Sequence, residues 1–379
     1  MRIMTIYGTR PEAIKVAPVI KEIEQDPRFQ SVTVVTGQHR EMLDQVNEIF
    51  SIVPDHDLDV FEPGQSLNSL MSKMFARLDP VLDEEQPDAV LVQGDTSTVA
   101  AAAIASFYRG VPVVHLEAGL RSGDIRSPFP EEANRKLTTQ ITALHLAPTS
   151  RSKDNLLRES VSADDIVVTG NTVIDALLLA VEYQQPFTEP AVQEAVDSGR
   201  PILLVTTHRR ENWGDAMVNV GKALRDIAEA YPDFVIILPA HRNPIVRESV
   251  LPQIEGLTNV IVTEPMAYGE FTRVMKAAHI ILTDSGGVQE EAPSLGKPVL
   301  VLRDNTERPE AVDAGTVRLI GTHRERIVHE FKRLADEPEK YQLMANAVNP
   351  YGDGQAAART VAAISQLLGV GLRIEDFRG

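Results

Sequence analysis

Residues 89–119 read AVLVQGDTSTVAAAAIASFYRGVPVVHLEAG, and this stretch decides the class of fold. An apolar run at 89–93 leads through a polar turn into a longer apolar segment, and a second β-branched run follows at 111–115. Both short runs are apolar at nearly every position, which is typical of strands buried on both faces of a parallel sheet. The stretch therefore predicts two parallel strands joined by a helical crossover.

The same alternation runs along the chain in two series. The first series predicts strands at 2–7, 31–36, 89–93, 111–115, 144–147 and 166–169. The second predicts strands at 202–206, 234–239, 260–263, 280–283, 299–302 and 317–320. Between strands, apolar residues recur at helical spacing, as in 67–82. We therefore expect an α/β protein with two Rossmann-like parallel-sheet domains that face a ligand-binding cleft at the carboxyl ends of their strands.

The boundary between the two halves is predicted at 184–199, a stretch with two prolines and few large aliphatic residues. A helix at 172–183 would precede this boundary and bridge the halves. A last helical segment, at about 354–368, follows the break NPYGDG.

Composition excludes several classes of function. The chain has 379 residues, a formal net charge of −17 at pH 7 and no cysteine. Nucleic acids and anionic membranes are read with clustered Lys and Arg, so neither is an expected partner. Disulfides and thiolate sites are excluded. The longest apolar stretch, 99–107, is far shorter than the ~20 residues that span a bilayer, and residues 1–12 form no signal-peptide core, so we expect a soluble, cytoplasmic protein.

A predicted nucleotide site lies at residues 283–287, TDSGG, which end a strand and begin a helix. A serine and two glycines at a helix start expose N–H groups that attract a phosphate or diphosphate. Glu290 and Glu291 lie one turn further on, where a carboxylate could hold a ribose diol. The alternative is that Ser285 acts only as an N-cap.

A second predicted anion site lies at residues 8–12, GTRPE, directly after the first strand. Arg10 and Lys15 could meet an anion near this helix start, while a turn with solvated charges is the alternative. The segment is neither a GxGxxG fingerprint nor a P-loop, so dinucleotide or ATP binding in those forms is not expected.

Acidic residues stand at the ends of predicted elements. Asp95 and Glu117 follow neighbouring strands, and Glu131 lies at a helix start, where a lone acid would be read as a dipole partner. Two carboxylates that face one crevice suit proton transfer near neutral pH. His208 ends the first strand of the second half and could face them, although a lone histidine is often structural. No histidine pair has metal-ligand spacing, so no metal is expected.

Seven motifs occur in order over nearly the whole chain: GTRPE with Lys15, VQGDTST, HLEAGLRS, PFPEEANR, THRREN, ILTDSGGVQEEAPSLGKPVLV and ERPEAV. Together they strongly resemble the bacterial non-hydrolysing UDP-N-acetylglucosamine 2-epimerases. The resemblance implies a glycosyltransferase-B-type fold, in which the N-terminal domain 1–170 is completed by a C-terminal helix, 354–379, and a UDP-binding domain spans 171–353. It also implies a cofactor-independent homodimer that interconverts UDP-N-acetylglucosamine and UDP-N-acetylmannosamine for surface polysaccharides.

Carried over position by position, the resemblance implies a catalytic set of Asp95, Glu117, Glu131 and His208. The implied substrate contacts are Arg10, Lys15, Asp95, Glu117, His208, Phe271, Ser285, Gly286, Gly287, Glu291 and Arg308. Met266 stands near the uracil pocket where some relatives carry Gln, and we expect a backbone contact with the base there. Gln38 and His241 would contribute to a second, allosteric UDP-N-acetylglucosamine site.

The implied chemistry is an elimination, because carbon 2 of the sugar is not next to a carbonyl and its proton is not acidic. A carboxylate removes this proton while UDP leaves carbon 1, and UDP then adds back to the 2-acetamidoglucal. Asp95 and Glu131 would share the base and acid roles at carbon 2. Glu117 would position the sugar or take part in proton transfer, and His208 would bind or protonate the leaving phosphate.

Other functions stay open from the sequence. A hydrolysing relative would release N-acetylmannosamine and UDP, and a further relative would act on a different UDP-sugar. A retaining glycosyltransferase of the same fold would need an acceptor. A nucleotide-sugar-binding protein would keep TDSGG and ERPEA but has no need for Asp95, Glu117 and Glu131 together.

Overall fold

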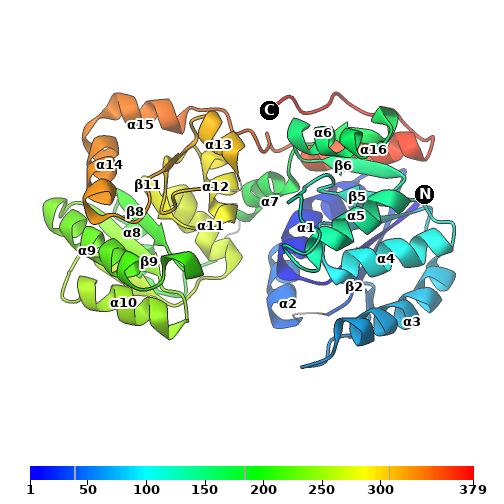
Figure 1. Cartoon of the computed structure of the whole chain (residues 1–379), viewed down its shortest axis with the longest axis horizontal. Helices are drawn as coiled ribbons and strands as arrows, with labels where there is room; N and C mark the ends of the chain where they lie inside the picture. The colour runs from blue at the N-terminus through cyan, green and yellow to red at the C-terminus, as the bar shows by residue number, and fades with distance from the viewer. Residues whose placement is uncertain (38–39, 183–184, 307) are drawn as a thin grey trace. The chain divides into compact units, whose positions relative to one another are not determined.

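The computed structural model describes residues 1–37, 40–182, 185–306 and 308–379, without the side chains of residues 40–42. The chain divides into two compact units (Figure 1): unit 1 comprises Met1–Leu179 and Tyr351–Gly379, and unit 2 comprises Ala180–Pro350. The domain limits expected from the sequence, 170/171 and 353/354, stay a prediction, as does the linker at 184–199, whose first residue lies outside the described residues.

Unit 1 contains a parallel sheet in which the described strands are β1 (Arg2–Tyr7), β2 (Gln30–Val35), β3 (His56–Asp57), β4 (Ala89–Gln93), β5 (Val113–Leu116), β6 (Leu144–Ala147) and β7 (Ile166–Val168). Their order is β3-β2-β1-β4-β5-β6-β7. The strand order reverses between β1 and β4, so right-handed crossovers place the helices that follow these two strands on opposite faces. The predicted strands of this half are confirmed, whereas β3 is too short and polar to have been predicted.

The helices of unit 1 follow the strands in alternation. They are α1 (Arg10–Gln25), α2 (Arg40–Ile49), α3 (Leu67–Glu85), α4 (Ser97–Tyr108), α5 (Glu131–Ile141), α6 (Ser150–Arg158), η1 (Ala163–Asp165), α7 (Thr172–Ala180) and α16 (Ala356–Leu367). Helix α4 packs between α3 and α5, and α1 packs against α2 and α16.

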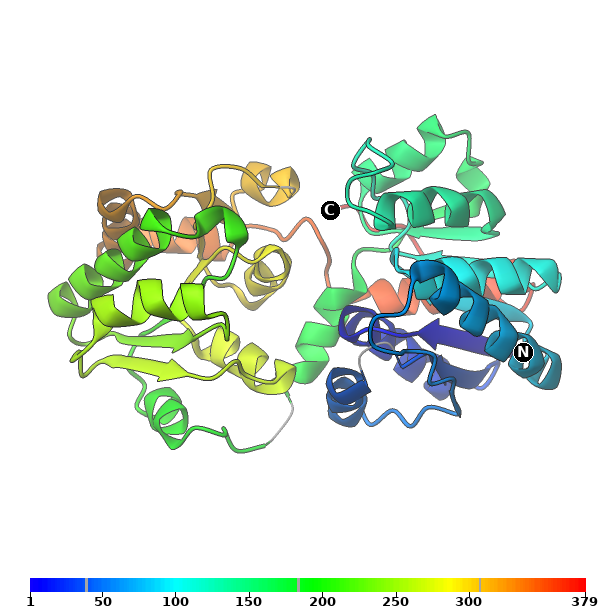
Figure 2. The same cartoon turned by 60° about the horizontal axis from the view of Figure 1, so that its bottom comes forward.

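The C-terminal segment completes unit 1, as expected from the resemblance. Helix α16 lies beside α1 (Figure 2), and Phe377 donates a backbone hydrogen bond of 2.7 Å to Val168 at the end of β7. The first N–H groups of α16, at Ala356 and Ala357, donate to the carboxylate of Asp175 on α7 at 3.3 and 2.9 Å. Burial raises the pKa of Asp175 to about 6, although these two hydrogen bonds lower it. The carboxylate therefore replaces the missing capping group of α16.

Unit 2 contains a second parallel sheet, whose described strands are β8 (Ile202–Thr206), β9 (Val235–Pro239), β10 (Val260–Thr263), β11 (Ile280–Thr283), β12 (Val299–Val301) and β13 (Val317–Leu319). Their order is β10-β9-β8-β11-β12-β13, so the order reverses again, between β8 and β11. All predicted strands of this half are confirmed.

The helices of unit 2 are α8 (Pro190–Asp197), η2 (Arg210–Asn212), α9 (Asp215–Ala230), α10 (Pro244–Ile254), α11 (Tyr268–Ala277), α12 (Gly286–Glu291), η3 (Ala292–Leu295), α13 (Pro309–Asp313), α14 (Arg324–Asp336) and α15 (Pro338–Ala345). Helix α9 packs against α10 and α14. Across the described parts of both units, no helix is both long and apolar enough for a membrane span.

Two histidines are buried in the sheet of unit 1. His115 on β5 pairs in register with His145 on β6, and both side chains are almost fully buried. Burial lowers the pKa of His115 to about 4 and that of His145 to about 3. Both rings are therefore neutral in the folded protein. Below pH ~6.5 these histidines take up protons in the unfolded chain but stay neutral in the folded chain. Their burial therefore costs no unfolding free energy above that pH, and the protein loses stability as the pH falls below it.

We predict that His145→Leu reduces the acid sensitivity of unit 1, because leucine has no group that is protonated on unfolding. The described hydrogen bonds do not involve the His145 ring, so the substitution breaks none of them. Between pH 6.5 and 5, the variant should lose about 2 kcal/mol less unfolding free energy than the wild type. Native-state amide hydrogen exchange in β5 and β6 measures this difference, with pH 7.5 as the reference. An equal loss in both proteins would contradict it.

Candidate active site

Glu117 directly follows β5 and is held by several donors. The ammonium group of Lys15, on α1, lies 2.6 Å from both carboxylate oxygens. The amide of Gln93, the last residue of β4, and that of Asn171 also donate to it, the latter at 3.3 Å. Only 11% of the Glu117 side chain is exposed. Its φ of 64° lies in the left-handed region, which costs a non-glycine residue about 1 kcal/mol or more. The hydrogen bonds to the carboxylate therefore stabilise Glu117 in a strained backbone conformation.

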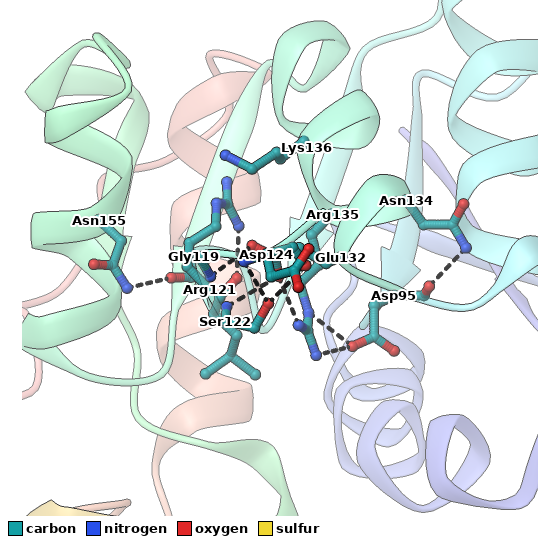
Figure 3. Close-up of polar contacts among 12 residues, drawn as sticks. Asp95, Gly119, Arg121, Ser122, Asp124, Glu132, Asn134, Arg135, Lys136 and Asn155 are labelled. Atoms are coloured by element: carbon teal, nitrogen blue, oxygen red, sulfur yellow. Dashed lines mark hydrogen bonds and ion pairs between the residues drawn. The ribbon is translucent and has the colours of Figure 1, made fainter. Parts of the chain in front are cut away.

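Asp95 follows the neighbouring strand, because β4 pairs with β5 in a register that sets Gln93 opposite Leu116. Arg135, on α5, donates to Oδ2 of Asp95 through Nε at 2.9 Å and Nη2 at 2.5 Å (Figure 3). Asn134 donates to the backbone carbonyl of Asp95 at 2.9 Å. Burial alone would lower the pKa of Arg135, but the charges of Asp95 and Glu132 raise it overall, so the guanidinium stays cationic. The carboxylates of Asp95 and Glu117 thus follow adjacent strands, as predicted.

Adjacent acids at the start of α5 have different surroundings. Glu131 is its first residue and half-buried, and the described hydrogen bonds and ion pairs do not involve its carboxylate. Glu132 is fully buried and accepts the backbone N–H groups of Ser122 and Gly123 at 3.1 and 3.3 Å. Burial raises the pKa of Glu132, but hydrogen bonds from Arg135 and these N–H groups lower it overall. Glu132 is therefore an ionised structural group, whereas Glu131 has a side chain available for chemistry.

The turn after β1 is organised by Glu12, a buried carboxylate that the sequence analysis did not single out. It accepts the N–H groups of Gly8 and Thr9 at 2.8 and 2.7 Å and the hydroxyl of Thr96 at 2.5 Å. Burial raises the pKa of Glu12, while these hydrogen bonds lower it. The carboxylate thereby joins the turn that carries Arg10 to the turn that carries Asp95.

In unit 2, Asp284 is a fully buried carboxylate at the end of β11. It accepts the hydroxyl of Thr207 at 3.0 Å, the N–H groups of His208 and Arg209 at 2.9 Å each, and the amide of Asn212 at 3.1 Å. Burial raises the pKa of Asp284, but the His208 side chain and the backbone donors lower it overall. The carboxylate therefore fixes the turn that follows β8.

His208 is held from one side of its ring. Its Nδ1 lies 3.1 Å from Oδ1 of Asp284, and 38% of its side chain is exposed. The ring stacks on His241 at a centroid distance of 5.7 Å. Burial and the neighbouring His208 lower the pKa of His241. A hydrogen bond from Nδ1–H to the carboxylate leaves Nε2 of His208 free to face a ligand.

The residues predicted to bind a phosphate, Ser285, Gly286 and Gly287, lie at the start of α12. Ser285 stands at the N-cap but makes no side-chain capping bond, so the simple capping alternative does not describe its hydroxyl. A side chain at Gly286 would displace Arg308, because a Cβ there would lie 2.6 Å from Nη1 of that residue. Arg308 in turn donates to Glu290 at 2.6 Å. Close packing therefore brings the guanidinium of Arg308 against Gly286.

The remaining predicted contacts lie around α11. Tyr268 donates to Glu291 at 3.0 Å, which places this carboxylate against the first residue of α11. Phe271, on the same helix, and Met266, just before it, are both half-buried. In the described residues, no group of His, Asp and Glu could hold a metal ion.

Comparison with known proteins identifies the family. Residues 21–365 match the sequence profile of the family described as UDP-N-acetylglucosamine 2-epimerase. The chain belongs to this family. It is 50% identical over 369 residues to the UDP-N-acetylglucosamine 2-epimerase of Escherichia coli (strain K12), covering 96% of this chain and 98% of that protein. The crystal structure of UDP-GlcNAc 2-epimerase from Neisseria meningitidis bound to UDP-GlcNAc matches with a TM-score of 0.82 at 46% identity, covering 97% of this chain and 100% of that one.

The resemblance inferred from the motifs is thus confirmed, and so is the glycosyltransferase-B-type fold. The kitacinnamycin glycotransferase shares this fold alone, with a TM-score of 0.64 at 12% identity over 97% of this chain and 99% of that one. Gln38, expected at an allosteric site of this epimerase-family chain, lies outside the described residues. His241 is exposed, and its role stays a prediction.

We predict that Asp284→Asn destabilises unit 2, because the new amide NH2 would face donors in a buried site. The loss should be about 3 kcal/mol of unfolding free energy. Trp213, the single tryptophan, follows this turn and reports its unfolding by fluorescence in urea. Asp226→Asn is the control: it breaks a partly exposed pair with Arg324 and should cost less than about 1 kcal/mol. Equal losses in the two variants would contradict the prediction.

Proposed function

We propose that the protein is a non-hydrolysing epimerase that interconverts UDP-N-acetylglucosamine and UDP-N-acetylmannosamine. The observation that carries the proposal is the pair of carboxylates, Asp95 and Glu117, that follow adjacent strands in a chain of this family. Each is paired with a cation of unit 1, Arg135 or Lys15. Inversion at carbon 2 without an adjacent carbonyl requires groups that remove and return a proton, and such carboxylates supply them.

The proposed reaction is elimination followed by re-addition. A carboxylate takes the proton from carbon 2, a double bond forms between carbons 1 and 2, and the bond from carbon 1 to the diphosphate oxygen breaks with its electron pair. The products are a 2-acetamidoglucal and UDP. UDP then adds back at carbon 1 while a proton is delivered to the opposite face of carbon 2. The proton that is removed is replaced, and the sugar is neither oxidised nor reduced overall, so the reaction needs no cofactor.

Unit 1 would supply the proton-transfer groups. Asp95 and Glu131 share the base and acid roles, and the half-buried carboxylate of Glu131 supports its part in them. Glu117, whose oxygens already accept from Lys15, orients the sugar or moves a proton together with that ammonium group. Arg10, at the start of α1, is a proposed contact of the departing diphosphate.

Unit 2 would bind the nucleotide. Charge that develops on the leaving phosphate is stabilised by N–H groups at a helix start and by cations. Ser285, Gly286, Gly287 and Arg308 supply such groups, and His208, oriented by Asp284, binds or protonates the phosphate. Glu291, Phe271 and Met266 are the proposed contacts of the ribose and the base, with Met266 acting through its backbone. Gln38 and His241 are proposed for a second, activating UDP-N-acetylglucosamine.

A cytoplasmic homodimer is part of the proposal. Phe107 and Tyr108 at the end of α4 and Leu137 on α5 are large apolar residues exposed to solvent, and these two helices pack together in unit 1. Apolar side chains on neighbouring helices support a contact with a second copy. Sedimentation of the purified protein measures its mass directly.

Proton NMR of the purified protein with UDP-N-acetylglucosamine alone tests the reaction. The anomeric signal of the second epimer should appear, and in D₂O both epimers should gain deuterium at carbon 2. Release of free N-acetylmannosamine would instead identify the hydrolysing reaction. Absence of any epimer without an acceptor would favour a glycosyltransferase, and product without solvent deuterium would exclude elimination.

We predict that Asp95→Asn and Glu117→Gln each lower kcat by about 10²–10⁴-fold, the usual cost of losing a positioned acid or base. UDP affinity, measured by calorimetry, should stay close to that of the wild type, because these side chains are proposed to act on the sugar and not on the nucleotide. Asp83→Asn is the control, since this exposed carboxylate pairs with Arg109 on the surface and with no other cation of the described residues. Nearly normal kcat in both site variants would remove their catalytic assignment.

A further inference from the structure

A network of three charged side chains, Asp95, Arg135 and Glu132, connects the turn after β4 to the loop that precedes α5. Arg135 pairs with Asp95 through Nε and Nη2 and with Glu132 through Nη1 at 2.8 Å (Figure 3). The side chain of Arg135 is 15% exposed and that of Glu132 is fully buried. A buried guanidinium between two carboxylates is fixed in place, because its planar fork satisfies both partners only in one orientation.

Glu132 is the residue of this network that lies farthest from Asp95. Its Oε2 accepts from Arg135 and from the N–H of Ser122, and its Oε1 accepts from the N–H of Gly123. A carboxylate without access to water is stable only when its oxygens are satisfied in this way. The residue therefore anchors Arg135 to the backbone of the 122–123 turn and has no oxygen left over for a substrate.

The two oxygens of Asp95 have different environments. Nε and Nη2 of Arg135 both approach Oδ2, whereas none of the hydrogen bonds in the described structure involves Oδ1. A quarter of the side chain is exposed. Asn134, next to Arg135 on α5, holds the backbone carbonyl of the same aspartate. Helix α5 thus fixes Asp95 at two points and leaves one carboxylate oxygen uncommitted.

We infer that Arg135 is a positioning residue for Asp95, with Glu132 as its anchor, and that Oδ1 is the oxygen that exchanges a proton with carbon 2. This inference rests on the proposed function and adds to it the group that orients one catalytic carboxylate. A carboxylate that rotates freely would present either oxygen at varying angles, and a misplacement of about 1 Å can cost 10²-fold in rate. The guanidinium removes that freedom before the substrate binds.

The test is a double-mutant cycle between positions 135 and 95. Arg135→Gln should lower kcat by about 10–10²-fold with KM within about threefold of the wild type, because the interaction acts on the reacting carboxylate. In the Asp95→Asn background the same change should alter kcat by less than about threefold, since the carboxylate to be oriented is gone. Arg135→Lys keeps the charge but not the fork, so its kcat should lie between those of Arg135→Gln and the wild type.

The matched control is Arg359→Gln, which breaks an ion pair of similar burial with Asp353 at 2.7 Å. It should lower the thermal stability of the protein but leave kcat unchanged. If Arg135→Gln does not fold, the cycle is measured with Arg135→Lys and with Glu132→Gln, which releases the anchor. Normal kcat in the position-135 variants, or an equal loss in the Asp95→Asn background, would overturn the inference. A wild type that forms no epimer would refute the proposed function instead.

Discussion

Carboxylates without access to water must find donors inside the protein, and this constraint shapes the ends of both sheets. Glu12, Glu132 and Asp284 are each almost fully buried, and each accepts backbone N–H groups from a turn. The same carboxylates also hold a polar side chain: the Thr96 hydroxyl, the Arg135 guanidinium and the His208 imidazole, respectively. These hydrogen bonds fix the conformation of the turns, and the fixed turns hold the candidate site residues in defined positions.

In both units, buried carboxylates fix the turns at the point where the strand order of the sheet reverses. In unit 1 the strand order reverses between β1 and β4, and in unit 2 it reverses between β8 and β11. Four of the predicted site residues lie in or directly after the turns that follow these strands: Arg10, Asp95, His208 and Ser285. Parallel strands end together at one edge, so residues that are far apart in sequence become neighbours within a unit. The two units differ in the side chains at these strand ends: unit 1 has carboxylates paired with cations, and unit 2 has a glycine-rich helix start.

The sequence predicted the strands well because buried parallel strands are continuous apolar runs. It placed Asp95 and Glu117 after neighbouring strands because both come just after such runs, and their catalytic roles stay a prediction. Its failures have a common physical origin. Asp284 and Arg135 act through partners 76 and 40 residues away, and such pairing arises only in the folded chain. Glu131 and Glu132 are identical side chains in adjacent positions, and only the helix face that each occupies separates an available carboxylate from a buried anchor. Residue 112 is proline, which lacks an N–H for the sheet, and β5 begins one residue after it rather than at 111.

Helix α16 has a consequence for how the chain assembles as it leaves the ribosome. Unit 2 is a continuous stretch, 180–350, and all of its strands are available once that stretch has emerged. Unit 1 lacks residues 351–379 until after unit 2 has been synthesised, so the surface of α1 that packs against α16 stays uncovered throughout the synthesis of unit 2. Unit 1, whose strands precede those of unit 2 in the chain, is therefore completed only after unit 2.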